Sequence, residues 1–160
     1  MQKIVDFVIE LDKLKAVTRK TRPLGLVRQE NSAEHSWQIA MLAASLEPYA
    51  WTEIDINRVI SMLLVHDIGE IDTGDTIVYQ TEGAVERKAA EWVAVKRIFG
   101  ILATPQAAQF LALWEEFEAD ETPDARFANA ADRAMLVLLN LANHGQSWIE
   151  NGISYQRVID

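Results

Sequence analysis

Acidic residues and a histidine gather at one point of the sequence, directly after an apolar helical run. Residues 59–65 are apolar at helical spacing, and His66 and Asp67 follow them as an adjacent pair. Glu70 comes four residues after His66, so one further helical turn places these side chains on one face. Four acids and one histidine thus fall within ten residues. A cation would relieve the mutual repulsion of the acids and use the imidazole as a ligand, so the segment predicts a metal site.

The composition of the chain limits what this site can serve. The 160 residues, 49% hydrophobic and 24% charged, are ordinary for one soluble globular domain. A net charge of −9 argues against a nucleic-acid polymer or an anionic membrane as partner, whereas a small anionic substrate stays compatible with a local cation. The lack of cysteine excludes a thiolate zinc site, and charges within residues 1–17 argue against a signal peptide or membrane span. We expect a cytoplasmic protein.

Apolar periodicity, capping residues and prolines predict an all-α fold of about six or seven helices. We expect one domain over residues 1–160, with a core at roughly 10–145. An ordered loop is expected at 71–80, and the tail beyond 145 is expected to pack back through Trp148, Ile153 and Tyr155. The expected helices cover residues 2–16, 32–46, 56–68, 82–99, 105–118 and 123–143.

Two more polar residues occupy apolar helix faces. His35 lies on the inner face of the helix that Asn31 and Glu34 can begin with a capping box. Asp132 lies on the apolar face of the last long helix, where an acid is rarely buried without a partner. A satisfied core histidine and a structural salt bridge are the alternatives for these two. Together with the His-Asp pair, they make two imidazoles and two carboxylates, a set that suits a divalent ion and leaves positions open for water or substrate.

Two further features allow a simple interpretation and a functional one. Residues 19–25 form a basic connection broken by a proline, which is either a solvated loop or an anion clamp. His144, just before Gly145, is most simply a C-terminal helix cap. Because no histidine then remains for a second site, we favour one metal ion over two.

These residues resemble the HD-domain superfamily of metal-dependent phosphohydrolases, whose signature is H…HD…D. The resemblance covers residues ~10–145 and is closest to the 5′-deoxynucleotidase-like subgroup. It implies one divalent metal ion (Mn, Co, Mg, Zn, Fe or Ni) held by His35, His66, Asp67 and Asp132. The segments that carry it are Glu30–Ser36, His66–Asp75, Leu113–Glu118 and Ala131–Asp132.

The resemblance also implies roles for residues around the metal. Arg19 takes the place of the family's phosphate-orienting arginine, Glu70 that of a glutamate acting on the attacking water, and Asp75 that of an aspartate near the sugar. These three are the expected catalytic residues. Lys20 stands where the best-defined nucleotidases have a tryptophan. Besides Arg19 and Asp75, the expected substrate contacts are Lys20, His35, Asp67, Thr76, Ile77, Val78, Glu116 and Asp132.

The resemblance therefore predicts a metal-dependent 5′-(deoxy)nucleotidase that releases phosphate from nucleoside 5′-monophosphates. One alternative is an HD phosphohydrolase acting on another phosphomonoester or a phosphodiester, and the other is a non-catalytic metal-binding module. We expect a small phosphate ester as partner, with neither a nucleic-acid polymer nor a membrane. A homodimer through exposed faces of the helices at 2–16 and 82–99 is also expected.

Overall fold

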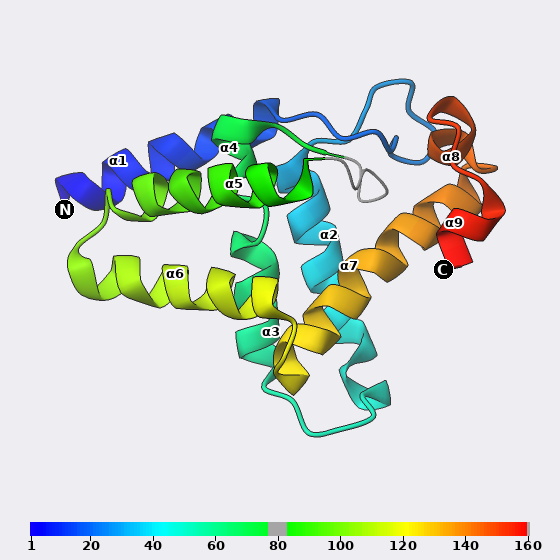
Figure 1. The fold of residues 1–160 in the computed structure, drawn as a ribbon. Coiled ribbons are helices and arrows are strands. Elements are labelled where there is room, and N and C mark those ends of the chain that lie inside the picture. Colours follow the sequence, from blue (N-terminus) through cyan, green and yellow to red (C-terminus); the bar gives the residue numbers. More distant parts are fainter. Residues whose placement is uncertain (77–82, 160) are drawn as a thin grey trace.

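The computed structural model describes residues 1–76 and 83–159, and helices are the regular structure of this part of the chain (Figure 1). Short 3₁₀ turns follow two of them, at Asp12–Ala16 and Glu47–Tyr49. The predicted all-α fold is confirmed. The helices are α1 (Gln2–Leu11), α2 (Ser32–Leu46), α3 (Ile56–Val65), α4 (Glu70–Thr73), α5 (Ala84–Phe99), α6 (Thr104–Ala119), α7 (Pro123–Ala142), α8 (Gln146–Glu150) and α9 (Tyr155–Ile159).

The observed helix ends differ from the predicted ones around the His-Asp pair. The helix expected at 56–68 ends at Val65, and the chain turns before α4 begins. The ordered loop expected at 71–80 is wrong in its first part, because α4 continues to Thr73. Gly69 permits this path, since a Cβ there would lie 3.3 Å from the carbonyl oxygen of Glu91 on α5. A larger residue would push α4 and its carboxylates away from α5.

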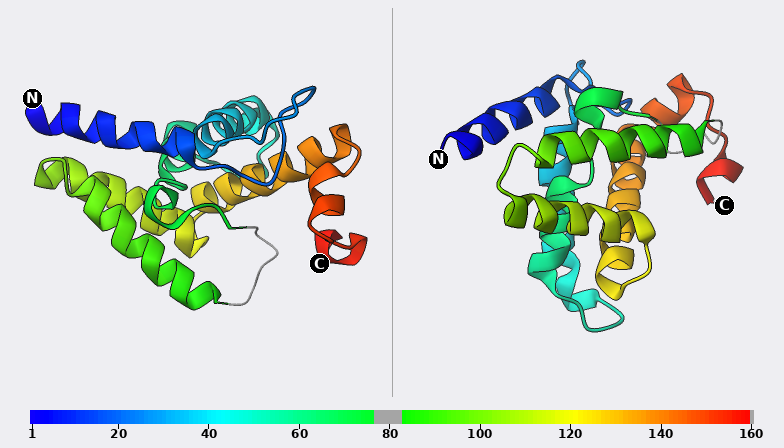
Figure 2. Two further views of the ribbon diagram at one scale, coloured as in Figure 1. Left: turned by 90° about the horizontal axis from the view of Figure 1, so that it is seen from above. Right: turned by 60° about the vertical axis from the view of Figure 1, so that its left-hand side comes forward.

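The central helices α2, α3 and α7 pack against one another, as both views of Figure 2 show. Their shared core contains fully buried aliphatic side chains such as Ile39, Val59 and Leu63. The polar groups His35 and Asp132 project from α2 and α7 into this same region. These two predicted metal ligands are therefore held by this core.

A second core lies under α1, α5 and α6, with Val95 and Phe99 among its buried residues. Val65 and Ile68 belong to this second core, whereas Leu63 belongs to the first. The chain thus crosses from one core to the other at the His-Asp pair. Packing on both sides fixes the backbone at this point, which a site with defined geometry requires.

The C-terminal tail forms α8 and α9, at the opposite end of the molecule from the N-terminus of α1 (Figures 1 and 2). The expectation that Tyr155 packs back is wrong, because its side chain is 78% exposed. Trp148 and Ile153 are half-buried. Among the described residues, no helix is both long and apolar enough to cross a membrane.

Candidate active site

Four of the predicted site residues meet where α2, α3 and α7 converge. His35 Nε2 lies 2.8 Å from Asp132 Oδ1, and His66 Nε2 lies 2.9 Å from Asp67 Oδ1. The His35 side chain is fully buried, and the other three are largely buried. The structure therefore brings together the residues that the H…HD…D pattern singled out.

The end of α3 orients His66. Its Nδ1 lies 2.9 Å from the carbonyl oxygen of Leu63, and since a carbonyl only accepts, Nδ1 carries the hydrogen. Trp114 Nε1 donates to the His66 carbonyl oxygen at 3.0 Å and fixes the backbone of the same residue. The Nε2 nitrogen is thereby turned toward the carboxylates, the orientation in which a second partner holds a metal-ligating histidine.

The atoms of this group fit a divalent cation. One nitrogen from each of His35 and His66 and one oxygen from Asp132 all lie within 4.8 Å of one another. Ligands held about 2.0–2.3 Å from one cation are at most about 4.6 Å apart, so small shifts would suffice. Asp67 adjoins this set through His66. The mixed nitrogen and oxygen donors suit a borderline or hard divalent metal.

The surrounding charges shift the pKa values of this group. Burial alone lowers the pKa of His66, but the negative charge and hydrogen bond of Asp67 outweigh it and raise this pKa to about 9. Burial raises the pKa of Asp67, but the positive charges of His66 and Arg19 outweigh it and hold this pKa below its usual range. Burial also raises the pKa of Asp132, but the hydrogen bond from His35 outweighs it and lowers this pKa. The His66 imidazole and the Asp67 carboxylate thus stabilise each other as unlike charges.

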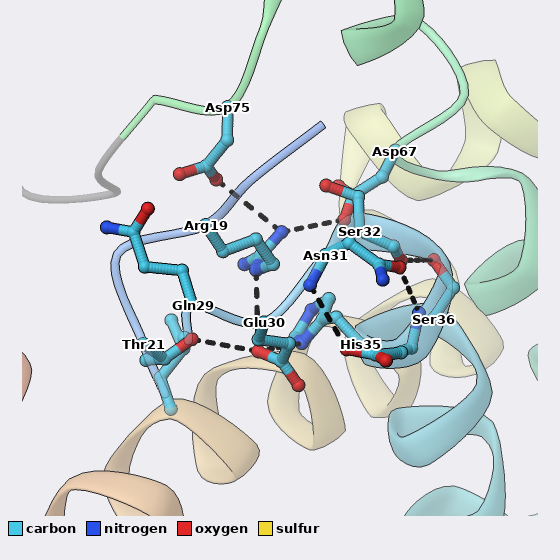
Figure 3. A network of polar contacts seen from close by, with 12 residues as sticks. Arg19, Thr21, Gln29, Glu30, Asn31, Ser32, His35, Ser36, Asp67 and Asp75 are labelled. Atoms are coloured by element: carbon cyan, nitrogen blue, oxygen red, sulfur yellow. Dashed lines mark hydrogen bonds and ion pairs between the residues drawn. The ribbon is translucent and has the colours of Figure 1, made fainter. Parts of the chain in front are cut away.

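Arg19 lies beside this group and is 8% exposed (Figure 3). Its Nη1 donates to Asp67 Oδ2 at 2.8 Å and lies 3.6 Å from Asp75 Oδ1. Burial lowers the pKa of Arg19, but these two carboxylates outweigh it, and the guanidinium stays charged. The first residue of the basic connection is therefore buried against the acidic site and is not part of a solvated loop.

Glu70 reaches the site from the start of α4. Its Oε2 accepts a hydrogen bond of 2.6 Å from Ser32 Oγ at the start of α2. Burial, with the nearby charge of Asp67, raises the pKa of Glu70 to about 8. Burial likewise raises the pKa of Asp75. A carboxylate with a pKa close to neutrality can both take up and release a proton.

These side chains line one end of a cavity of about 280 Å³. The lining includes five predicted residues, Arg19, Lys20, Glu70, Asp75 and Thr76, with His66, Asp67 and Asp132 at its base. The volume is at the lower end of the usual range for small-molecule pockets. The far end is formed by α7 and the C-terminal tail, through Asn140, Ser147, Trp148, Asn151 and Ile153.

Glu116, a predicted substrate contact, lies outside the cavity lining. Its carboxylate accepts hydrogen bonds from Arg58 and from Thr122, 2.7 Å for the latter. Glu118, two residues further along α6, lines the cavity instead. His35 lies behind Asp132 and also outside the lining. The predicted contacts Ile77 and Val78 lie outside the described residues.

Several functional candidates escaped the sequence analysis. Ser32 was not among the predicted site residues. Asn31 caps α2, with Oδ1 accepting from the Glu34 backbone at 3.0 Å, and the Ser32 hydroxyl donates to Glu70. Glu30 lies beneath Arg19, and nothing in its local sequence marks it as buried. The cavity wall formed by the tail needed the fold to be found.

Comparison with known proteins identifies the class. A family model described as HD domain matches residues 11–160. A crystal structure from Magnetospirillum magnetotacticum MS-1, described as a predicted metal-dependent phosphohydrolase, is 44% identical with a TM-score of 0.92, over 99% of this chain and 81% of that one. This chain belongs to the HD-domain family.

More distant relatives carry a more specific name. The 5′-deoxynucleotidase HDDC2 of Danio rerio is 25% identical over 86% of this chain and 68% of its own length. A 5′-deoxynucleotidase of Enterobacter sp. (strain 638) is 29% identical over 72% of this chain and 61% of its own length. The predicted resemblance to metal-dependent HD phosphohydrolases with 5′-deoxynucleotidase-like members is confirmed.

The pKa shifts predict that the metal-free protein loses stability as pH rises from 6 to 9.5. His66 has a folded pKa of about 9 against an ordinary 6.5, so the stabilisation by Asp67 is complete below pH 6.5 and lost through pH 9. Glu70 has a folded pKa of about 8 against 4.5, so the folded state keeps a proton that the unfolded chain has released, and the free energy of unfolding falls from pH 4.5 up to pH 8. The expected loss is on the order of a few kcal/mol.

Chemical denaturation of the chelator-treated protein at both pH values measures this loss. Glu70→Gln should show a smaller decrease than the wild type, because it removes one of the two titrating groups. The acids with lowered pKa values stay ionised throughout this interval and should contribute no change. Equal unfolding free energies at pH 6 and 9.5 would contradict the assignment.

Proposed function

We propose that this protein is a metal-dependent 5′-nucleotidase that hydrolyses nucleoside 5′-monophosphates, with deoxynucleotides as the first candidates, to nucleoside and phosphate. The observation that carries the proposal is one cavity whose lining joins a buried arginine, a carboxylate of raised pKa and a histidine–aspartate cluster. The names of the zebrafish and Enterobacter relatives support the substrate class.

The metal ligands in this proposal are His35, His66, Asp67 and Asp132. Their convergence, and the hydrogen on His66 Nδ1 that leaves Nε2 free to coordinate, support the assignment. When bound, one divalent ion such as Mn, Co, Mg, Zn, Fe or Ni would supply positive charge to the phosphoryl group and lower the pKa of a water molecule. The donor set alone does not select among these ions.

Arg19 is the proposed phosphate-binding residue. A planar guanidinium can donate two parallel hydrogen bonds to phosphate oxygens, which a lysine cannot do. Its contacts with Asp67 and Asp75 hold the group at the cavity surface in the absence of an anion. Phosphate oxygens entering the cavity would accept from the donors that now face these carboxylates.

Glu70 is the proposed general base. The hydrogen bond from Ser32 Oγ fixes one carboxylate oxygen, which leaves the other to take the proton of the attacking water. Its raised pKa matches proton transfer near neutral pH. Asp75, 3.6 Å from Arg19, is the proposed partner of a sugar hydroxyl and the proposed proton donor to the leaving oxygen.

The nucleoside would occupy the end of the cavity that the tail encloses. Trp148 and Ile153 offer apolar surface, and the amide oxygen of Asn151 offers an acceptor, to a planar polar base. Asn140 Oδ1 accepts from the backbone nitrogens of Ser147 and Trp148, at 3.1 and 3.2 Å, and so fixes the start of α8. Lys20, in place of the family's tryptophan, lines the cavity near Arg19.

The two alternatives make different use of these residues. A non-catalytic metal-binding module would need its ligands but neither a buried arginine nor a carboxylate of raised pKa in the same cavity. Another phosphomonoester or a phosphodiester would use the catalytic end but not the tail. The arrangement of both ends favours a nucleoside monophosphate over either alternative.

Glu70→Gln should reduce phosphate release from 5′-deoxynucleotides by about 10²–10⁴-fold, because it removes the general base. Its metal affinity should stay close to that of the wild type. The assay uses metal-stripped protein reloaded with Mn²⁺, Co²⁺, Mg²⁺ or Zn²⁺, and a panel of 5′-deoxynucleotides, 5′-ribonucleotides and simple phosphomonoesters. Glu115→Gln, an exposed glutamate on α6 outside the cavity lining, is the matched control. Full turnover by Glu70→Gln would exclude its proposed role.

Trp148→Ala should raise the KM for 5′-nucleotides by about tenfold or more, because stacking on an aromatic side chain contributes about 1–3 kcal/mol per base. Hydrolysis of 2-deoxyribose 5-phosphate, which has no base, should change little. Ile149→Ala is the control, since this adjacent side chain is 75% exposed. An equal loss on both substrates would assign Trp148 to folding and not to base recognition.

A single HD domain over residues 1–160, assembled as a cytoplasmic homodimer, completes the proposal. The family match over 11–160 supports one domain, and exposed apolar residues of α1 (Val8 58%, Ile9 63%) and α5 (Val85 79%, Val93 63%) support an interface. Val8→Glu should shift sedimentation of the protein from dimer to monomer without loss of secondary structure. A wild-type protein that sediments as a monomer at micromolar concentration would contradict the proposed dimer. The proposed cytoplasmic location is tested separately, by cell fractionation.

A further inference from the structure

Glu30 is a buried acid, 2% exposed, between the proposed anion site and the proposed metal site (Figure 3). Backbone hydrogen bonds fix this residue to the segment opposite. The backbone nitrogen of Arg19 donates to the Glu30 carbonyl oxygen at 2.9 Å, and the backbone nitrogen of Glu30 donates to the Thr21 carbonyl oxygen at 3.0 Å. Thr21 Oγ1 also donates to Glu30 Oε2 at 2.8 Å. The carboxylate is therefore held at a defined place.

Two nitrogen atoms without a partner face the same oxygen of Glu30. Arg19 Nε lies 3.9 Å from Glu30 Oε2, and His35 Nδ1 lies 4.0 Å from it. Both nitrogens are buried and make no hydrogen bond. A buried polar atom without a partner costs about 1–3 kcal/mol. Arg19 Nε is a donor without an acceptor and His35 Nδ1 is a ring nitrogen without a partner, so their shared approach to one carboxylate needs an explanation.

We propose that Glu30 is a positioning residue that serves both sites, accepting from His35 Nδ1 and from Arg19 Nε when metal and phosphate are bound. The metal half of this inference rests on the proposed function. In the contact described here, His35 Nε2 donates to the Asp132 carboxylate. Coordination of a cation by Nε2 requires a neutral ring that carries its one hydrogen on Nδ1. The carboxylate nearest to that hydrogen is Glu30.

The same carboxylate orients the arginine. Arg19 uses Nη1 toward Asp67 and the cavity, while Nε points back to Glu30. A hydrogen bond from Nε fixes the plane of the guanidinium and leaves the terminal nitrogens to face a phosphate. One acid thus aligns a metal ligand and a phosphate ligand, and a movement of about one ångström would bring both contacts to hydrogen-bond length.

Glu30→Gln tests this role, because it keeps the size of the side chain and removes the charge. We expect the dissociation constant for Zn²⁺ or Mn²⁺, measured by chelator competition, to rise about 10–100-fold. The affinity of the metal-saturated protein for inorganic phosphate, measured by calorimetry, should fall as well. The melting temperature of the metal-free variant is recorded beside these values.

Glu34→Gln is the matched control. It removes the same charge from the start of the same helix, but its carboxylate pairs with Arg28 at 2.7 Å instead of facing the site. We expect metal and phosphate affinities within about twofold of the wild type, as for a surface ion pair. Equal losses in both variants, or wild-type metal affinity in Glu30→Gln, would overturn the proposal.

A measurement on the wild type covers the case in which Glu30→Gln fails to fold. The chain has three histidines, so nitrogen-15 NMR of labelled imidazoles can assign each ring. After addition of Zn²⁺ we expect His35 to bind through Nε2 and to carry a hydrogen-bonded proton on Nδ1. Coordination through Nδ1, or rapid solvent exchange of that proton, would overturn the proposal.

None of these readouts requires turnover. If no phosphomonoester is hydrolysed but metal affinity still depends on Glu30, the proposed function fails and the positioning role stands. If nucleotides are hydrolysed and Glu30→Gln binds metal as the wild type does, the positioning role fails and the proposed function stands.

Discussion

Contacts between imidazole nitrogens and carboxylate oxygens, His35 to Asp132 at 2.8 Å and His66 to Asp67 at 2.9 Å, hold the centre of this molecule together. Isolated charges would be costly to bury there, and each pair offsets the cost only because both partners are held in place. Acids still outnumber cations in this region, and burial together with this excess of negative charge raises the pKa of Glu70 to about 8. A divalent cation would offset this excess of negative charge. The same buried imidazoles and carboxylates would then both bind the metal and affect the stability of the core.

The end of α3 shows how the fold supplies that geometry. The last carbonyl groups of any helix lack partners within it. Here the Leu63 carbonyl accepts from His66 Nδ1, and the His66 carbonyl accepts from Trp114 Nε1. Ending α3 at Val65 therefore provides the acceptors that orient a histidine. Gly69 then lets the chain turn closely past α5, which brings Glu70 back to the same cavity.

The residues that the sequence could predict share a local signal. Asn31 with Glu34 forms a capping box, and Asp132 is an acid on an otherwise apolar helix face. Each of these features can be recognised from residues within one or two helical turns. The ion pair of Glu116 with Arg58, which is distant in the sequence, has no such local signal, and neither has the position of Glu118 in the cavity lining. Glu30 was missed for a related reason, because its burial depends on contacts with residues 19–21. The short helix α4 was missed because four residues are too few to show a helical period.

The two ends of the cavity are stabilised by different elements. The proposed catalytic end depends on α2, α3, α4 and α7, which the two cores hold. The proposed nucleoside end depends on α8, which is attached through Asn140 and through the ion pair of Arg22 with Glu150 at 2.9 Å. Changes in the tail can therefore alter which substrate fits while leaving the reacting groups in place. This separation explains why a short pattern of histidines and aspartates predicts the type of reaction better than it predicts the substrate.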